Sequence, residues 1–96
     1  MKIKILPQAE QDLIDGFHFY EMQQAGLGGY FLDTLFSDIE SLEFFAGVHP
    51  VVFKQYRLLS KRFPFAVYYK MADGTVQVYA VLDCRRNPAW IHERLK

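Results

Sequence analysis

Two adjacent arginines, Arg85 and Arg86, follow a strand-like segment and offer the clearest chemistry in this sequence. Each guanidinium presents a planar fork of N–H donors that can bind a phosphate or a carboxylate with two hydrogen bonds. Asn87 and Pro88 come next, and Pro88 stops further strand pairing because it has no N–H to donate. An arginine pair fixed at the mouth of a sheet is suited to anion recognition, whereas the same pair in a loop could simply be solvated.

The two arginines are expected to have different roles. Neighbouring side chains of a strand point to opposite faces, so one guanidinium should turn inward and pin the tail. Asp83 and Glu93 are the nearest carboxylates that could accept it. The other guanidinium should face a partner, and we expect Arg85 to be this functional residue.

Charge is divided unevenly along the chain although the formal net charge is zero. Residues 1–50 carry two basic and eight acidic side chains, and residues 51–96 carry nine basic and three acidic ones, so the halves have formal charges of −6 and +6. This asymmetry indicates one face for an anionic partner and another that is only solvated. The neutral total argues against a simple nucleic-acid-binding domain.

The histidines and the cysteine predict no metal site. His18, His49 and His92 do not show metal-ligand spacing, and we expect neither a metal nor a cofactor. Cys84 is the only cysteine, which excludes an internal disulfide and is typical of a reducing cytoplasm. We expect it to be a small buried residue.

The hydrophobic period changes along the chain from two to 3.6 and back to two. A short strand over residues 1–5 precedes a helix that opens at Pro7. Asp73-Gly74 lies between two β-branched and aromatic runs, which is a strong hairpin signal. The expected helices have buried stripes of Ala9, Leu13, Phe17 and Tyr20, and of Leu27, Phe31, Leu35, Ile39, Leu42 and Phe45. The later strands are expected over residues 52–61, 65–71 and 76–82, with one face formed by Phe65, Val67, Tyr69 and Met71 and by Val76, Val78, Ala80 and Leu82, before a short helix over 88–95.

This order predicts an α+β fold, β-α-α-β-β-β-(α), with a two-helix hairpin packed on one face of a mainly antiparallel four-stranded sheet. Residues 1–96 are long enough for a single domain. No apolar run approaches the roughly 18–20 residues of a membrane span, and we expect a cytoplasmic protein. The second sheet face should stay free as a concave surface, lined by candidates that include Lys54, Tyr56 or Arg57, Tyr68, Tyr79 and Arg85.

The chain resembles the RelE/ParE superfamily of type II toxin–antitoxin toxins. The resemblance covers nearly the whole length and is most specific in the tail, where the order and spacing of several short motifs follow the ParE-like, plasmid-stabilisation branch. These motifs are Leu58-Leu59, the run from Phe63 to Tyr69, Val78-Tyr79-Ala80-Val81-Leu82 and Arg85-Arg86-Asn87-Pro88. The resemblance implies a small growth inhibitor that is neutralised by an antitoxin encoded beside it, and a toxin–antitoxin hetero-oligomer is one expected assembly.

Two activities occur in that superfamily, and the resemblance leaves both open. ParE-like members bind DNA gyrase without chemistry of their own, and we favour this branch because the Lys/Arg set of a nuclease is thin here. RelE-like members are ribosome-dependent endoribonucleases that cleave mRNA. An inactive or repurposed relative serving as a binding module is the third alternative, so whether the protein is an enzyme stays open.

The resemblance also directs attention to particular side chains. For a RelE-like reaction, Lys54, Arg57 and Arg85 could contact the scissile phosphate, and His92 or Tyr79 could move a proton. For a binding protein, the candidate contact residues are Arg62, Tyr68, Tyr79, Arg85 and Arg86.

Overall fold

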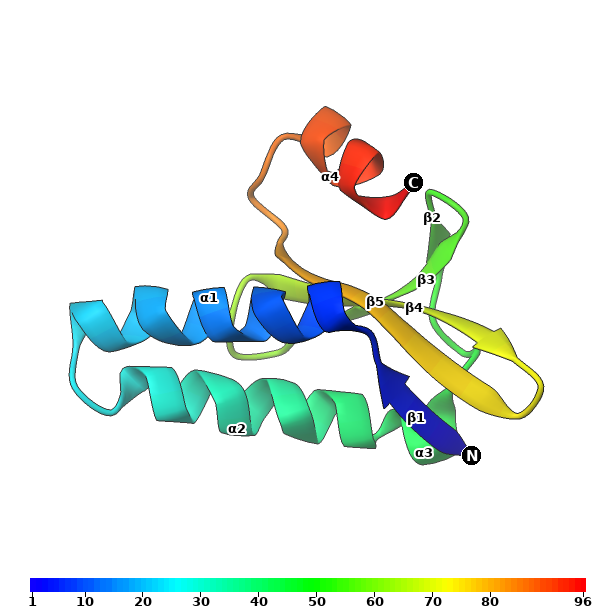
Figure 1. Ribbon diagram of the computed structural model, residues 1–96, viewed down its shortest axis with the longest axis horizontal. Coiled ribbons are helices and arrows are strands. Elements are labelled where there is room, and N and C mark those ends of the chain that lie inside the picture. The colour runs from blue at the N-terminus through cyan, green and yellow to red at the C-terminus, as the bar shows by residue number, and fades with distance from the viewer.

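The computed structural model describes all residues 1–96 as two helical elements of unequal size on the two faces of one sheet (Figure 1). The larger element is a helix hairpin, and the smaller is a C-terminal helix that stands on the other face (Figure 1). In chain order the elements are β1 (Lys2–Ile5), α1 (Pro7–Gln23), α2 (Leu27–Glu40), α3 (Leu42–Phe45), β2 (Val51–Val52), β3 (Gln55–Leu59), β4 (Phe65–Ala72), β5 (Thr75–Asp83) and α4 (Pro88–Leu95).

The sheet has the strand order β1-β5-β4-β3-β2. β1 runs parallel to β5, with Ile3 opposite Val76, and all other neighbours are antiparallel. The expected α+β architecture and the helix hairpin are therefore confirmed. The strand count is five instead of four, because the segment expected as one strand over residues 52–61 forms both β2 and β3.

A tight turn at Phe53 and Lys54 makes that division. Both residues have left-handed backbone, with φ of 52° and 68°. Two consecutive residues of this kind form the reverse turn that joins antiparallel strands, and Asn-Gly is its usual sequence. Phe and Lys carry no such signal, and each left-handed residue costs roughly 1 kcal/mol, so the sequence pattern predicted a continuous strand.

The α1–α2 hairpin closes through Glu21 and two glycines. Oε1 of Glu21 accepts hydrogen bonds from the backbone N–H groups of Gly26, at 3.1 Å, and Gly28, at 2.9 Å. These donors lie at the start of α2, where no intrahelical partner exists, so the carboxylate satisfies them. Gly28 also lets the helices approach, because a Cβ at this position would lie 2.6 Å from the carbonyl oxygen of Phe17.

The main core lies between the hairpin and the sheet. Ala9, Leu13 and Tyr20 of α1 are buried there as the stripe predicted, and Phe17 is half-buried. The second stripe is confirmed from Phe31 to Leu42, but α2 ends at Glu40 and Phe45 is 58% exposed. Aromatic rings pack on one another at the centre of this core, with centroids about 5 Å apart and mostly edge to face: Tyr20, Phe31, Phe63 and Phe65.

A β-bulge in β5 changes which side chains face this core. Tyr68 pairs with Ala80 whereas Tyr69 pairs with Val78, so Tyr79 is the extra residue. One inserted residue reverses the alternation beyond it. Val76 and Val78 therefore join the main core as expected, but Ala80 and Leu82 point to the opposite face, and Val81 takes the core position. The expectation that Val76, Val78, Ala80 and Leu82 share one face is wrong for this reason.

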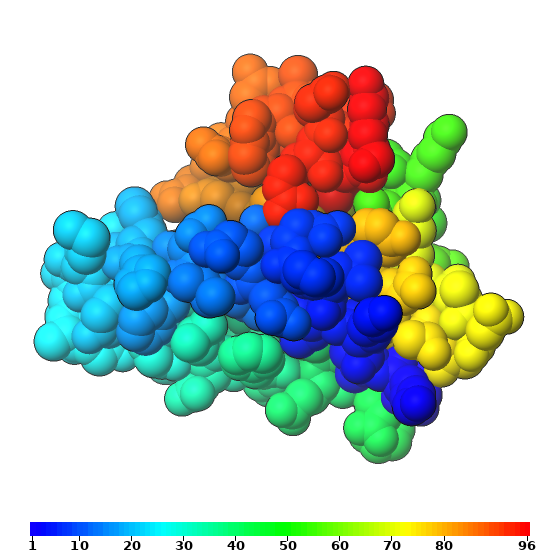
Figure 2. Space-filling view, viewed as in Figure 1, coloured from blue at the N-terminus to red at the C-terminus, as the bar shows by residue number.

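Helix α4 covers the face that the sequence led us to expect free. Ile91 and Leu95 of α4 pack on Ala66, Tyr68, Ala80 and Leu82 in a second, smaller core. The bulge makes this core possible because it delivers Ala80 and Leu82 to the α4 side. In Figure 2 the segment in orange and red stands above α1 as a separate ridge. We call residues 84–96 the C-terminal arm.

Candidate functional site

The C-terminal arm begins with Arg85 bound to Asp83. Nε of Arg85 donates to Oδ1 of Asp83 at 3.0 Å and its Nη2 donates to Oδ2 at 2.6 Å, and the backbone N–H of Arg85 adds a third bond to Oδ1 at 2.8 Å. These hydrogen bonds lower the pKa of the Asp83 carboxyl. Asp83 was one of the two expected partners, but the pinned arginine is Arg85, whereas we had expected Arg86. Arg85 remains accessible, with a side chain that is 64% exposed.

Arg86 lies over the indole of Trp90, with its guanidinium carbon 3.9 Å from the ring centroid. A guanidinium stacks well on an aromatic face, and its edge N–H groups stay free for another ligand. Asn87 begins α4, because its Oδ1 accepts from the N–H of Ala89 at 2.8 Å while Pro88 occupies the first helical position. The arm therefore presents Arg85 and Arg86 on a capped, ordered scaffold.

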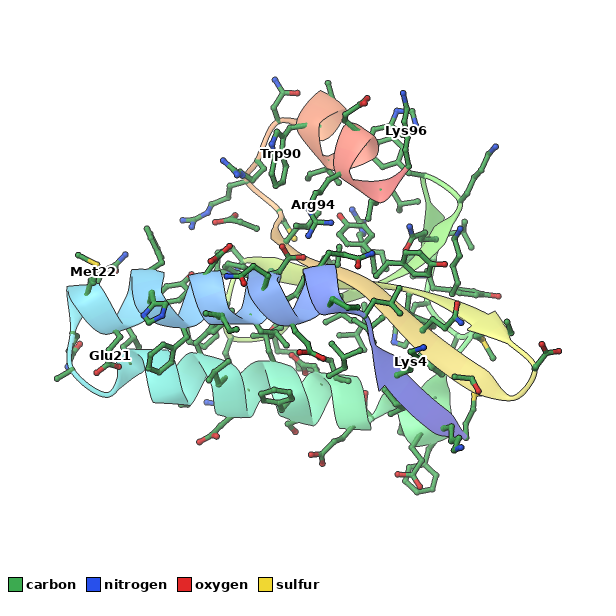
Figure 3. The ribbon with its side chains drawn as sticks, viewed as in Figure 1. Lys4, Glu21, Met22, Trp90, Arg94 and Lys96 are labelled. Carbon is green, nitrogen blue, oxygen red and sulfur yellow. The ribbon has the colours of Figure 1, made fainter.

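An ion pair fastens the arm to α1. Nη2 of Arg94 donates to both carboxylate oxygens of Asp12, and Oδ2 of Asp12 also accepts from the backbone N–H of Val81 at 3.0 Å. Burial raises the pKa of Asp12, although the bonds from Val81 and Arg94 act in the opposite direction. Arg94 and Trp90 project from α4 toward α1 in Figure 3. One carboxylate thus joins α1, β5 and α4.

These contacts border a cleft between α1 and α4 with a volume of about 400 Å³. Acidic, basic and aromatic side chains all line it, so it suits a polar peptide segment better than a small apolar ligand. We call it the arm cleft, and the residues that line it include Asp15, Phe19, Asp83, Arg86, Trp90 and Arg94.

A second cleft, of about 530 Å³, lies on the other side of α4. Here the structure brings together two of the candidate catalytic residues, Lys54 and His92. The imidazole of His92 stacks on the ring of Phe53, with centroids 4.5 Å apart and planes 12° apart. We call this the basic cleft, and it is lined by Phe53, Lys54, Lys70, His92, Leu95 and Lys96.

The other candidate residues lie apart from these clefts or beneath α4. Tyr68 is only 2% exposed, and burial raises the pKa of its hydroxyl. The guanidinium of Arg57 lies beside Tyr68 and Cys84, and its Nε is buried without a partner. Cys84 is exposed, which corrects our expectation of a buried thiol, and partial desolvation raises the pKa of its thiol.

Two further candidates make aromatic contacts. Nη1 of Arg62 donates to the Tyr30 hydroxyl at 2.6 Å, at the hairpin end of the molecule. Tyr79 is half-buried, and Nζ of Lys70 lies 4.9 Å above its ring centroid. The predicted site residues are therefore dispersed: some lie in the arm, the basic cleft and the Tyr30 contact, whereas Arg57, Tyr68 and Tyr79 lie in none of these regions, and the whole set does not form one constellation.

Several residues of the two clefts were not predicted from the sequence. The sequence pattern indicated no role in a site for Trp90, Arg94 or Asp12. Their i, i+4 spacing could have placed Trp90 and Arg94 on one face of α4, but nothing local connects that face with Asp12, 82 residues earlier. Lys70 was not predicted because strand alternation alone does not show which lysines converge.

The structure also bears on two other kinds of site, a metal centre and a membrane span. Nowhere in residues 1–96 do three or more His, Cys, Asp or Glu side chains gather in a way that could hold a metal ion. No helix combines the length and apolar character needed to cross a membrane.

Comparison with known proteins gives a likeness of fold. No protein-family model matches the chain, and no curated protein matches it in sequence. Six chains of solved structures match it. One of them belongs to a structure described as the chromosomal ParDE TA system from P. aeruginosa, and it aligns with a TM-score of 0.77 at 17% identity, covering 84% of this chain and 92% of that chain. At this identity the match shows a shared fold and leaves function to be argued from the site.

Proposed function

We propose that this chain is the toxin of a type II toxin–antitoxin system, a ParE-like growth inhibitor of the plasmid-stabilisation branch that acts in the cytoplasm by binding DNA gyrase. The observation that carries the proposal is the shared fold, at a TM-score of 0.77, with a chain from a ParDE TA system. The sequence resemblance in the tail supports it independently. The arm, with Arg85 and Arg86 exposed on an ordered scaffold, is the surface we assign to the target.

The dispersal of the cations favours a binding protein over a nuclease. Phosphoryl chemistry needs charges that converge on the reacting phosphate. Arg85 is engaged by Asp83, whereas Arg57 is a half-buried residue of β3 that lies opposite Tyr68. Neither lines the cleft that contains Lys54 and His92. The arrangement therefore supports recognition of a protein surface by the arm.

The RelE-like alternative rests on one observation. Lys54 and His92 line the same cleft with Lys70, so a cation and a group able to move a proton stand close to one another. If this cleft cut mRNA on the ribosome, Lys54→Ala would abolish cleavage and Arg85→Ala would have little effect.

An antitoxin partner is the second part of the proposal. The outer side of the α1–α2 hairpin carries an apolar groove of about 330 Å³, in which Ile14 is 47% exposed and Phe36 is 40% exposed. An amphipathic helix of an antitoxin would bury these side chains, and an extended acidic segment could continue onto the basic half of the chain. Ordering a disordered antitoxin tail costs free energy, so an apolar anchor of this kind has to accompany the charge contacts.

Expression with and without the neighbouring gene tests the toxin assignment. The chain alone should stop growth, and co-expression with a short adjacent reading frame should restore growth and yield a stable complex. Ile14→Glu should weaken the complex, whereas Met22→Glu, on the same helix but 88% exposed and outside the groove, should not. A chain that is harmless alone and ignores its neighbour would contradict the proposal.

The target can be identified from which nucleic acid, DNA or mRNA, is cleaved in induced cells. Binding to gyrase should give cleaved gyrase–DNA complexes and filamentation while mRNA stays intact. Arg85→Ala and Arg86→Ala should reduce this damage without unfolding the chain, because both side chains are on the surface. Discrete, ribosome-dependent cuts found by primer extension on mRNA would overturn the gyrase assignment and favour the RelE-like alternative.

A further inference from the structure

We infer that the basic cleft is a binding site for a nucleotide that carries two or more phosphates. The cleft lies between the β2–β3 turn, β4 and α4, on the side of α4 away from the arm cleft. Its volume of about 530 Å³ falls in the range of cofactor-sized ligand sites. The inference does not depend on the proposed toxin function, because neither Arg85 nor Arg86 takes part.

The charge of the cleft suits a polyphosphate. Lys54, Lys70 and Lys96 come from three different parts of the chain and line one hollow, with no acidic side chain among the six lining residues. Lys96 is paired with Glu93 at 3.1 Å, but both side chains are more than 60% exposed, and such a pair contributes little. Three ammonium groups can each donate to phosphate oxygens, and no neighbouring carboxylate competes for Lys54 or Lys70.

An aromatic wall stands beside these cations. The ring of Phe53 is 37% exposed and is held parallel to His92, so the pair forms a flat platform at the cleft. Phe53 has φ of 52° and Lys54 has φ of 68°, at a turn where Asn and Gly would fit without strain. The turn thus presents a ring and an ammonium group at the same cleft. A flat base stacked on a ring next to cations that bind its phosphates is the common chemistry of nucleotide recognition.

The surroundings favour a small ligand over a nucleic-acid strand. A strand needs a cationic track along several nucleotides. Outside the basic cleft, Arg94 is bound to Asp12, and Arg57 is a half-buried residue of β3 that does not line the cleft, so neither extends the three lysines into a track. The formal net charge of the chain is also zero. A single nucleotide fills the cleft without needing such a track.

Calorimetric titration of the full chain with ADP, ATP, pyrophosphate and ten-residue oligonucleotides of thymidine and uridine tests the inference. ADP and ATP should bind saturably at one site. Lys54→Ala and Lys70→Ala should each weaken binding by about tenfold or more, as expected for a lost charge-assisted bond. Phe53→Asn removes the ring, and asparagine tolerates the left-handed backbone of the turn. This variant should therefore weaken ADP binding and leave pyrophosphate binding unchanged.

Lys61→Ala is the matched control, because Lys61 is an exposed lysine outside the cleft and should leave the affinity unchanged. Thermal melts should show that all four variants fold, since each altered side chain lies on the surface. Absence of saturable nucleotide binding, or equal weakening by Lys61→Ala, would overturn the inference. So would saturable binding of a ten-residue oligonucleotide that ADP cannot displace, which would identify a strand as the ligand.

Discussion

Replacing Gly28 with alanine tests a close approach of two backbones in the fold, the contact between α1 and α2. A Cβ at Gly28 would lie 2.6 Å from the carbonyl oxygen of Phe17 and 2.8 Å from Cβ of Glu21. The first of these atoms belongs to the backbone of α1 and cannot rotate away. The methyl group therefore has to move one helix away from the other, and the 2.9 Å bond from the Gly28 N–H to Glu21 would lengthen with it.

Two opposing effects set the magnitude. Alanine favours a helix interior over glycine by about 1 kcal/mol. Overpacking of a close contact costs roughly 1–3 kcal/mol, and loss of the hydrogen bond to a carboxylate adds about 1 kcal/mol or more. The net result for Gly28→Ala is a loss of about 1–3 kcal/mol in the free energy of unfolding. For a domain of this length, each 1 kcal/mol lowers Tm by roughly 4–8 °C.

Gly29 supplies the control at the next position of the same helix. A Cβ there meets nothing within 4 Å, so Gly29→Ala keeps the helix benefit without the clash. Thermal and urea unfolding should show Gly28→Ala below the parent chain and Gly29→Ala at or above it. If Gly28→Ala is as stable as Gly29→Ala, the helices can separate at no cost and the reasoning from close approach fails.

Three further predictions concern titratable groups. Arg94→Ala leaves the half-buried Asp12 carboxylate without its guanidinium and should lower the free energy of unfolding by roughly 1–3 kcal/mol. Arg85→Ala removes a solvent-exposed pair and should lower the free energy of unfolding by less, and urea unfolding of both variants measures the difference. Hydrogen bonds from Arg85 hold the pKa of Asp83 below 3.8, so the pairing stabilises the fold above this pH, and the stabilisation is lost as the pH falls further. The free energy of unfolding of Asp83→Asn should therefore fall less in acid than that of the parent chain. An equal fall for both chains would contradict this prediction. Burial lowers the pKa of His49 below 6.5, so the folded state keeps it neutral and loses stability as the pH drops below 6.5; His49→Gln should remove that slope between about pH 7.5 and 5.5 in the same assay.

The periodic parts of the fold could be predicted from the sequence. Pro7 marks the start of α1, Asp73-Gly74 marks the β4–β5 turn, and stripes such as Ala9 and Leu13 give the buried face of α1. These features depend on local propensity and on a single repeating period, and both can be recognised from residues that are close together in the sequence. They fixed the element order and the fold class.

The errors came from single residues that interrupt a period. The bulge at Tyr79 places Ala80 and Leu82 on the other face, and no residue type at this position indicates a β-bulge. The turn at Phe53 and Lys54 depends on backbone angles that these residues seldom adopt. Both events determine what covers the second sheet face. The candidate site was predicted least well for this reason, since its clefts form where α4 meets that face.

The pairing of β1 with β5 has a consequence for how the chain is made. Ile3 lies opposite Val76 and Ile5 opposite Val78. More than 70 further residues must therefore be synthesised after β1 before β5, its partner in the sheet, is available. At roughly 5–20 residues per second, translation leaves β1 unpaired for several seconds or more. Contacts this distant along the chain also slow folding itself. A nascent chain interrupted before β5 contains the residues of the helix hairpin but lacks β5 and the arm. If the arm binds the target as proposed above, such fragments would be harmless to the cell that makes them.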